Sequence, residues 1–170
     1  MATAYYTADL DTLTYLVDAP MALQAAMMGP VFERARESAR KASCLSNVKN
    51  LSLAMQMYAA DNDDSLPEAS GWVEALMDYI MDESVLKCPD DESEATCSYG
   101  MNEALSGKSL AELANPEEVV VFFETANPGD NPVGGAEDVV DPPRHMGGNN
   151  YGFGDGHATW LEEAPSFEVE

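Results

Sequence analysis

The chain has very little positive charge. Only 8 of its 170 residues are Lys or Arg, against 31 Asp and Glu, and the formal net charge is −23 at pH 7. Residues 1–49 hold five acidic and five basic side chains, so the rest of the chain carries the whole excess. Such an acidic surface repels phosphate backbones and anionic membranes. We therefore expect no nucleic-acid partner, and the charge favours solvation over a specific cation-binding role.

Cysteine is scarce and odd in number, with Cys44, Cys88 and Cys97 only. No two of these residues are two to four positions apart, which argues against a zinc ribbon. A bridge between Cys88 and Cys97 would close the short polar loop 89–96 and contribute on the order of 2–3 kcal/mol in an oxidising compartment. The alternative is three reduced thiols, with Cys44 on a helix face. The sequence leaves both interpretations open.

The N-terminal part also lacks an uninterrupted apolar run that could cross a bilayer. Its most apolar stretch, residues 13–28, is interrupted by Asp18, Pro20 and Gln24. A central Asp costs about 2.5–3.5 kcal/mol on membrane insertion. No signal peptide is recognisable either. We interpret residues 1–29 as an atypical N-terminal segment, and we expect membrane contact only if an anchor is missing from this chain.

Neither glycine nor proline occurs between Pro30 and Ala60. Apolar side chains recur there at helical spacing, at Leu45, Val48, Leu51, Met55 and Tyr58. Proline suits a first helical turn because its missing N–H would be unpaired there. The pattern predicts one long amphipathic helix over residues 30–62, ended by the turn-forming run that follows.

The remaining residues, 63–170, predict a globular head with short elements. A second helix is expected over residues 71–81, and the apolar run 119–124 is typical of a central strand. Residues 127–143 are rich in Gly, Pro and Asp and are expected to form a long loop. The fold class is therefore α+β, as a single domain, with short accessory helices.

Both histidines lie near the C-terminus, and their surroundings predict a hairpin over residues 150–162. Asp155-Gly156 separates two aromatic segments, which is the strongest short-range signal for a tight turn. His145, Asp155 and His157 could supply two imidazoles and a carboxylate to a metal. Structural roles are favoured instead, because neighbouring strand residues face opposite sides and a turn Asp commonly caps backbone N–H groups. No serine lies in a nucleophile frame, so we expect no catalytic residues and no enzyme.

The same segment resembles a bacterial prepilin-type family, whose C-terminal module has a histidine, nine residues and Asp-Gly. His145, Asp155, Gly156 and His157 match that signature. Further similarity extends through the predicted helix and the middle of the chain, in the stretches 30–40, 43–49, 57–63, 86–89 and 98–102. The chain is thus similar to type IV pilins and type II secretion pseudopilins over about 140 of its 170 residues.

The resemblance implies a long N-terminal helix packed on a small antiparallel sheet, and a structural subunit of a filament outside the cell or in its envelope. Subunits of this kind assemble by packing their N-terminal helices, with themselves as a homopolymer or with other pilin-like subunits. The expected interface consists of Leu16, Val17, Leu23, Met27, Val31 and Phe32. The resemblance implies an extracellular or cell-surface location, although the absence of a signal leaves a cytoplasmic one open.

The alternative function is a pilin-derived module that binds calcium or another ligand and does not polymerise. Major pseudopilins can hold Ca²⁺ in an acidic loop near their C-terminal strands. Asp130, Asp138 and Asp141 offer hard oxygen ligands in the corresponding loop, without EF-hand spacing. A metal-dependent hydrolase that uses the histidines is a third and more distant hypothesis.

Overall fold

The computed structural model describes the backbone of residues 21–169 and the side chains of residues 29–169. The chain divides into two units, Met1–Glu37 and Ser38–Glu170. Helix α2, Met21–Asp61, contributes residues to both units. The larger unit holds the core, the sheet and the C-terminal hairpin, and is called the head below.

Helix α2 begins at Met21, before the start at Pro30 that the sequence predicted. Residues 21–28 are Met, Ala, Leu and Gln, which are among the strongest helix formers. Pro30 lies inside the helix and removes only one main-chain donor. The helix ends where Asp63 and Asp64 take left-handed φ angles of 53° and 59°.

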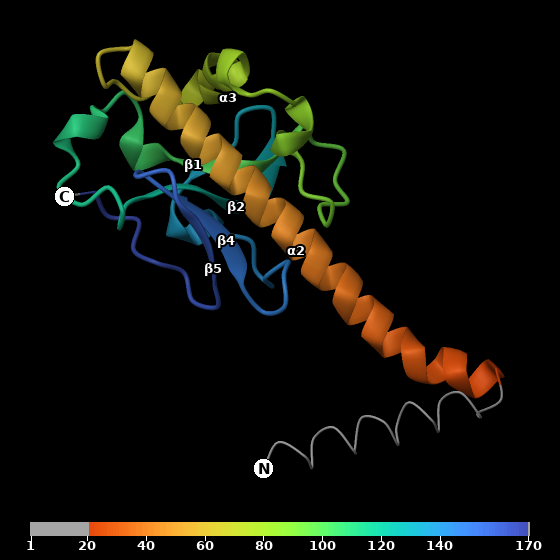
Figure 1. Ribbon diagram of the computed structural model, residues 1–170. Helices are drawn as coiled ribbons and strands as arrows, with labels where there is room; N and C mark the ends of the chain where they lie inside the picture. The colour runs from red at the N-terminus through yellow and green to blue at the C-terminus, as the bar shows by residue number, and fades with distance from the viewer. Residues whose placement is uncertain (1–20, 170) are drawn as a thin grey trace, which may run out of the picture. The chain divides into compact units, whose positions relative to one another are not determined.

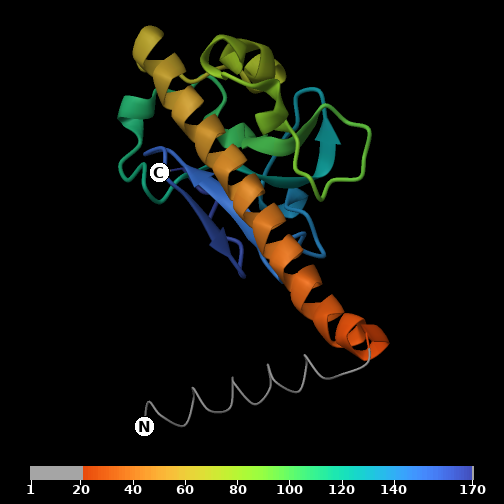
Figure 2. The same cartoon turned by 45° about the vertical axis from the view of Figure 1, so that its right-hand side comes forward.

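Within the head, α2 buries one face against the sheet, as Figures 1 and 2 show from two directions. Its buried side chains follow helical spacing: Cys44, Val48, Leu51, Met55 and Ala59. They join one hydrophobic cluster with residues of the sheet, including Met101 and Phe122. The predicted amphipathic helix is therefore confirmed, and its core-facing stripe begins at Cys44.

The sheet has five strands in the order β3-β1-β2-β4-β5. Their bounds are Cys97–Asn102 (β1), Val120–Gly129 (β2), Val133–Gly134 (β3), Asn149–Phe153 (β4) and Ala158–Leu161 (β5). All neighbouring pairs are antiparallel except β1 with β3. The predicted α+β class with a small, mainly antiparallel sheet is confirmed.

Strand β2 lies at the centre of the sheet and is buried on both faces. Val121 and Phe122 pack with α2 in the larger cluster, whereas Val120 and Phe123 pack on the opposite face with Tyr151. The C-terminal segment covers that second face, where the Phe167 ring lies edge-on to Phe123 at 5.1 Å between centroids. Burial on both faces explains why this strand is an almost continuous apolar run.

Shorter helices connect these elements. Helix α3, Trp72–Leu76, buries Trp72 and Leu76 and passes directly into a 3-10 turn, so the expected helix over 71–81 is shorter than predicted. The 3-10 helices are Ala69–Gly71, Met77–Tyr79, Glu83–Leu86, Glu103–Leu105, Leu110–Glu112 and Ala136–Asp138.

Strand β4 approaches the helix closely at Gly152. A Cβ atom at this position would overlap the Ser52 hydroxyl and would lie 2.8 Å from Val48 Cγ1. We expect Gly152→Ala to lower the free energy of unfolding by about 1–3 kcal/mol, because the packed helix must shift. Gly129→Ala is the matched control, since nothing lies within 4 Å of its Cβ position. Urea unfolding of both variants measures the difference, and equal stabilities would contradict the close approach.

Candidate functional site

A disulfide joins Cys44 of α2 to Cys88, which follows the 3-10 helix Glu83–Leu86. The two Cα atoms are 5.3 Å apart and both side chains are fully buried. The predicted bridge between Cys88 and Cys97 is therefore wrong. Cys97 is a free, buried thiol in β1, and its Sγ lies 3.3 Å from the Tyr99 carbonyl oxygen. Cys44 pairs with Cys88 because it lies on the core-facing stripe of the helix.

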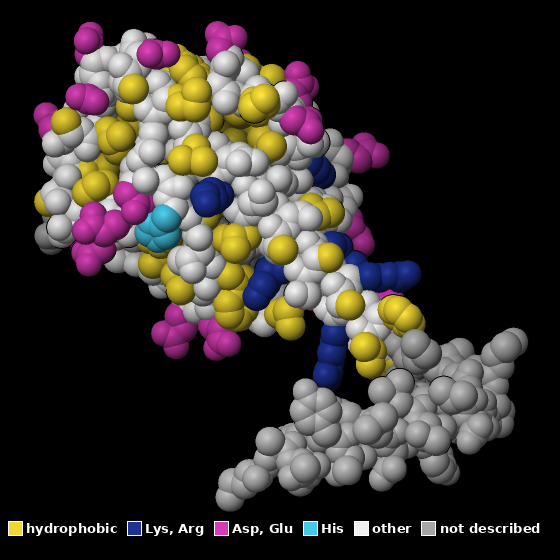
Figure 3. Space-filling view, in the orientation of Figure 1, with side chains coloured by type: hydrophobic (Ala, Val, Ile, Leu, Met, Phe, Trp, Pro, Cys, Tyr) yellow, Lys and Arg dark blue, Asp and Glu magenta, His cyan; other side chains and the backbone are white. Residues whose placement is uncertain are grey.

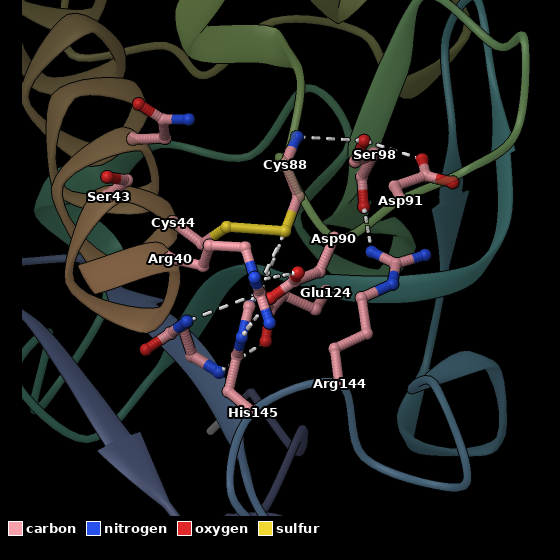
Figure 4. Close-up of a disulfide and its surroundings, with 12 residues drawn as sticks. Arg40, Ser43, Cys44, Cys88, Asp90, Asp91, Ser98, Glu124, Arg144 and His145 are labelled. Carbon is pink, nitrogen blue, oxygen red and sulfur yellow. Dashed lines mark hydrogen bonds and ion pairs between the residues drawn. A yellow bond between two sulfur atoms is a disulfide. The ribbon is translucent and has the colours of Figure 1, made fainter. Parts of the chain in front are cut away.

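A buried histidine and carboxylate lie against this disulfide (Figure 4). His145 Nε2 is 2.8 Å from Glu124 Oε1 and 3.4 Å from Cys88 Sγ. Glu124 Oε1 is itself 3.9 Å from Cys88 Sγ. None of these three side chains has solvent exposure. Burying a charged group costs free energy unless the group has a partner. The contact between His145 and Glu124 gives each of these buried side chains a partner.

Two further charged side chains, Asp90 and Arg40, lie on the side of the other imidazole nitrogen, His145 Nδ1. His145 Nδ1 is 3.1 Å from Asp90 Oδ2. Asp90 also forms an ion pair with Arg40, which projects from α2 one turn before Cys44. The imidazole thus lies between two carboxylates and links helix α2, the segment after Cys88 and strand β2.

His145 is held by a tight turn of the backbone. Its N–H donates to the Gly148 carbonyl at 3.2 Å, and its carbonyl accepts from the Gly148 N–H at 3.0 Å. The two residues between them, Met146 and Gly147, have φ angles of 52° and 84°. Positive φ at both central positions defines a type I′ turn. The Trp160 indole N–H of β5 donates to the same His145 carbonyl at 2.9 Å and connects the turn to the C-terminal hairpin.

Glu124 is positioned by strand pairing and by Asn150. It lies in β2, where its partner across the ladder is Tyr99 of β1. The Asn150 backbone N–H donates to Glu124 Oε2 at 2.8 Å, and the Asn150 side-chain amide donates to Oε1 at 3.3 Å. These donors fix the carboxylate plane and direct Oε1 toward His145 and Cys88.

A second polar layer surrounds the residues after Cys88. The Ser98 hydroxyl donates to Asp91 at 2.6 Å and accepts from the Cys88 N–H at 3.0 Å. Burial by itself raises the pKa of Asp91. Hydrogen bonds from Ser98, Ser93 and Lys87 lower the pKa by more than burial raises it, so the pKa lies well below its ordinary value. The Arg144 guanidinium donates to the carbonyls of Ser98 and Thr125 at 3.2 and 2.9 Å.

The chemistry of the group follows from its burial and its pairings. Both nitrogens of His145 contact carboxylate oxygens, and neither faces solvent. A general acid or base must reach a proton of its substrate, which this imidazole does not. Sulfur, imidazole and carboxylate are nevertheless metal-ligand types, and one ligand atom each from Cys44, Cys88, Glu124 and His145 lies within 4.8 Å of the others.

Within the described residues, the metal site of His145, Asp155 and His157 that the sequence disfavoured is not formed. His157 Nδ1 contacts Asp155 Oδ1 at 2.5 Å in the exposed hairpin turn, and its ring stacks on Phe153. Burial raises the pKa of Asp155, and hydrogen bonds from the His157 backbone and side chain lower it below the ordinary value overall. Gly156, with φ of 87°, supplies the left-handed conformation of this turn. His145 instead lies with Cys44, Cys88 and Glu124, which are called the disulfide group below.

The predicted calcium ligands do not come together. Asp138 accepts hydrogen bonds from the Gly135 N–H at 3.0 Å and the Asn127 amide at 2.9 Å. Asp130 accepts from the Thr96 hydroxyl at 2.9 Å. Within residues 29–169, Asp130, Asp138 and Asp141 do not form a group with ligand atoms at metal-binding distances. The carboxylates of Asp130 and Asp138 hold local loop structure instead.

Of the predicted assembly residues, Val31 and Phe32 are exposed, at 66% and 56%. Leu23 and Met27 belong to α2, but their side chains lie outside the described residues. Leu16 and Val17 lie outside the described residues altogether. None of the helices between residues 21 and 169 combines the length and hydropathy needed to cross a membrane.

Sequence reasoning missed the disulfide pairing and the role of Glu124. A signal for the pairing existed, because Cys44 precedes Val48 by one turn and shares the buried stripe of α2. Glu124 carried a weaker signal, as the charged residue that directly follows the apolar run 119–123, four residues of which lie in the central strand. Its partner, His145, is 21 residues later, and no local rule connects them.

Comparison with protein-family models gives a match over most of the chain. A family model described as a protein of unknown function, DUF1559, matches residues 33–159. The chain belongs to the DUF1559 family. The match includes all four residues of the disulfide group and most of the C-terminal hairpin. No curated protein and no solved structure matches the chain.

Alkylation tests which cysteines of this DUF1559 protein are bonded and which is free. Burial raises the pKa of Cys97 to about 12, so its reactive thiolate is rare at neutral pH. We expect no alkylation by iodoacetamide in the native protein, one adduct after unfolding without reductant, and adducts on all three cysteines after unfolding with reductant. Intact mass spectrometry gives the count, and peptide mapping should place the single adduct on Cys97. An adduct on Cys44 or Cys88 before reduction would rule out the pairing.

Proposed function

We propose that this protein is a non-enzymatic structural subunit of a pilin-like filament. The observation that carries the proposal is the exposed apolar pair Val31 and Phe32 on α2. Core packing uses α2 only from Cys44 onward, so these side chains do not serve the described core. Because Val31 and Phe32 are adjacent and both exposed, they can form part of an apolar patch that a neighbouring subunit covers.

Charge supports assembly through the helix. Five of the eight basic residues lie on α2, and the segment 33–49 of the helix therefore carries most of the positive charge. Figure 3 shows Lys and Arg side chains along the helix, while most acidic side chains lie on the rest of the head. In a filament these basic side chains can pair with acidic residues of neighbouring subunits and offset the repulsion between the acidic heads.

The proposed location is outside the cell or in its envelope. Disulfides persist in oxidising compartments and are rare in the cytosol. The disulfide between Cys44 and Cys88 supports that location. The C-terminal histidine and Asp-Gly signature acts, in this proposal, as a structural element that closes the head, with His145 packed on the disulfide.

Sedimentation velocity over a range of protein concentrations tests the proposal. The wild-type chain should form concentration-dependent assemblies, and the double variant Val31→Asp/Phe32→Asp should sediment as a monomer. Met81→Asp is the control for added negative charge. Met81 is fully exposed and lies outside helix α2. A wild-type chain that stays monomeric throughout would overturn the filament function and favour the non-polymerising module.

A further inference from the structure

We propose that the dithiol form of this protein holds a zinc ion between Cys44, Cys88, Glu124 and His145. The ligand set of two thiolates, one imidazole and one carboxylate matches the types that bind Zn²⁺ in four-coordinate sites. All four side chains are fully buried, as is usual for a closed, structural metal site. The proposal goes beyond the filament function and does not depend on it.

The distances between ligand atoms are close to those of a zinc tetrahedron. Zinc bonds of about 2.0–2.3 Å place neighbouring ligand atoms roughly 3.3–3.8 Å apart. In the disulfide form, Cys88 Sγ is 3.4 Å from His145 Nε2 and 3.9 Å from Glu124 Oε1. His145 Nε2 and Glu124 Oε1 are 2.8 Å apart and would separate slightly. The largest change is the separation of the two sulfur atoms once their bond is broken.

The surrounding hydrogen bonds are those that a zinc site requires. A histidine that binds zinc commonly donates its other ring N–H to a carboxylate. Asp90 Oδ2 lies 3.1 Å from His145 Nδ1 and is suited to accept that proton. The Asn150 N–H holds Glu124 Oε2 at 2.8 Å, and Oε1, which also accepts from the Asn150 amide at 3.3 Å, faces the ion. Arg40, paired with Asp90, offsets the negative charge of the ligand set.

Conversion of the disulfide form to the zinc-bound form requires a dithiol reductant, which supplies the two electrons and two protons. The reductant breaks the sulfur–sulfur bond, each cysteine gains one electron and one proton, and the reductant leaves as a disulfide. Zinc then displaces to solvent the two thiol protons and the proton that lies between His145 Nε2 and Glu124 Oε1. His145 binds through Nε2 as the neutral imidazole, with its remaining proton on Nδ1.

Cobalt(II) is the probe for this site, because its tetrahedral thiolate complexes absorb in the visible and near-ultraviolet. The full chain, reduced and freed of reductant under anaerobic conditions, should bind one equivalent with sulfur-to-cobalt charge-transfer bands, and one equivalent of zinc should remove them. The oxidised chain should show no such bands. This comparison needs no variant and therefore does not depend on whether a substituted chain folds.

Variants then assign the ligands. Cys97→Ser should leave the cobalt spectrum unchanged, because Cys97 lies outside the group. Cys88→Ser should abolish the charge-transfer bands of a single tightly bound ion. Asp90→Asn should weaken zinc binding by about 10–100-fold, because a neutral amide oxygen is a weaker acceptor than a carboxylate for the His145 Nδ1 proton. The proposal is overturned if reduced wild-type protein lacks these bands, or if Cys88→Ser keeps them while Cys97→Ser loses them.

Discussion

Reduction of the disulfide between Cys44 and Cys88 is expected to lower the free energy of unfolding by about 4 kcal/mol in the absence of metal. The bridge spans a sequence separation of 44 residues. Cross-linking a loop of this length removes a corresponding amount of conformational entropy from the unfolded chain. The bridge also fixes α2 to the segment that leads into β1, so its loss weakens the packing of helix on sheet.

Urea unfolding in metal-free buffer, with and without a reductant, measures this effect. The control is the double variant Cys44→Ala/Cys88→Ala, whose midpoint should not respond to reductant. Cys97→Ala is the second control and should keep the full response, since the free thiol takes no part in the bridge. Identical midpoints for oxidised and reduced wild-type protein would show that the disulfide does not stabilise the head.

Replacement of His145 by Ala is expected to cost about 3–5 kcal/mol of folding stability. Removing the imidazole takes away one partner of a buried carboxylate, which is strongly destabilising. In this variant Glu124 would remain fully buried without the imidazole that lies 2.8 Å from it. The empty space beside Cys88 adds a packing loss of its own.

His157→Ala is the matched control, because this histidine also contacts a carboxylate but lies in an exposed turn. Exposed ion pairs are worth about 1 kcal/mol or less, so its stability should change little. The two variants are compared by chemical unfolding of oxidised protein at neutral pH. Equal losses for the two histidines would contradict the buried pairing, and a second variant, Glu124→Gln, should be strongly destabilised as well if the pairing is right.

The main elements of the fold could be predicted from the sequence because their signals are local. Helical spacing from Val48 to Met55 and the apolar run around Phe122 each report on burial of a single element. The Asp155-Gly156 turn likewise encodes its own hairpin. The early start of α2 at Met21 was missed because Pro30 is typical of a helix start but is also tolerated inside a helix.

The disulfide group could not be predicted in the same way because its members are far apart in the sequence. Three cysteines allow three pairings, and the nearest pair in sequence, Cys88 and Cys97, is not the pair in contact. Glu124 and His145 meet only when β2 pairs with β4 and the Met146 turn returns the chain toward the helix. Tertiary packing decides such contacts, and local propensity carries no information about them.

In the proposed filament, two separate features of α2 act together, the exposed apolar pair Val31 and Phe32 and the positive charge of the helix. The disulfide group contributes to the same proposal by stabilising the head on the C-terminal half of that helix.

Electron microscopy of the negatively stained, oxidised chain at high concentration tests the central claim most directly. The account predicts filaments of regular diameter for the wild-type protein and for Met81→Asp, and isolated particles for Val31→Asp/Phe32→Asp. Isolated wild-type particles at every concentration, with the disulfide intact by mass spectrometry, would contradict it.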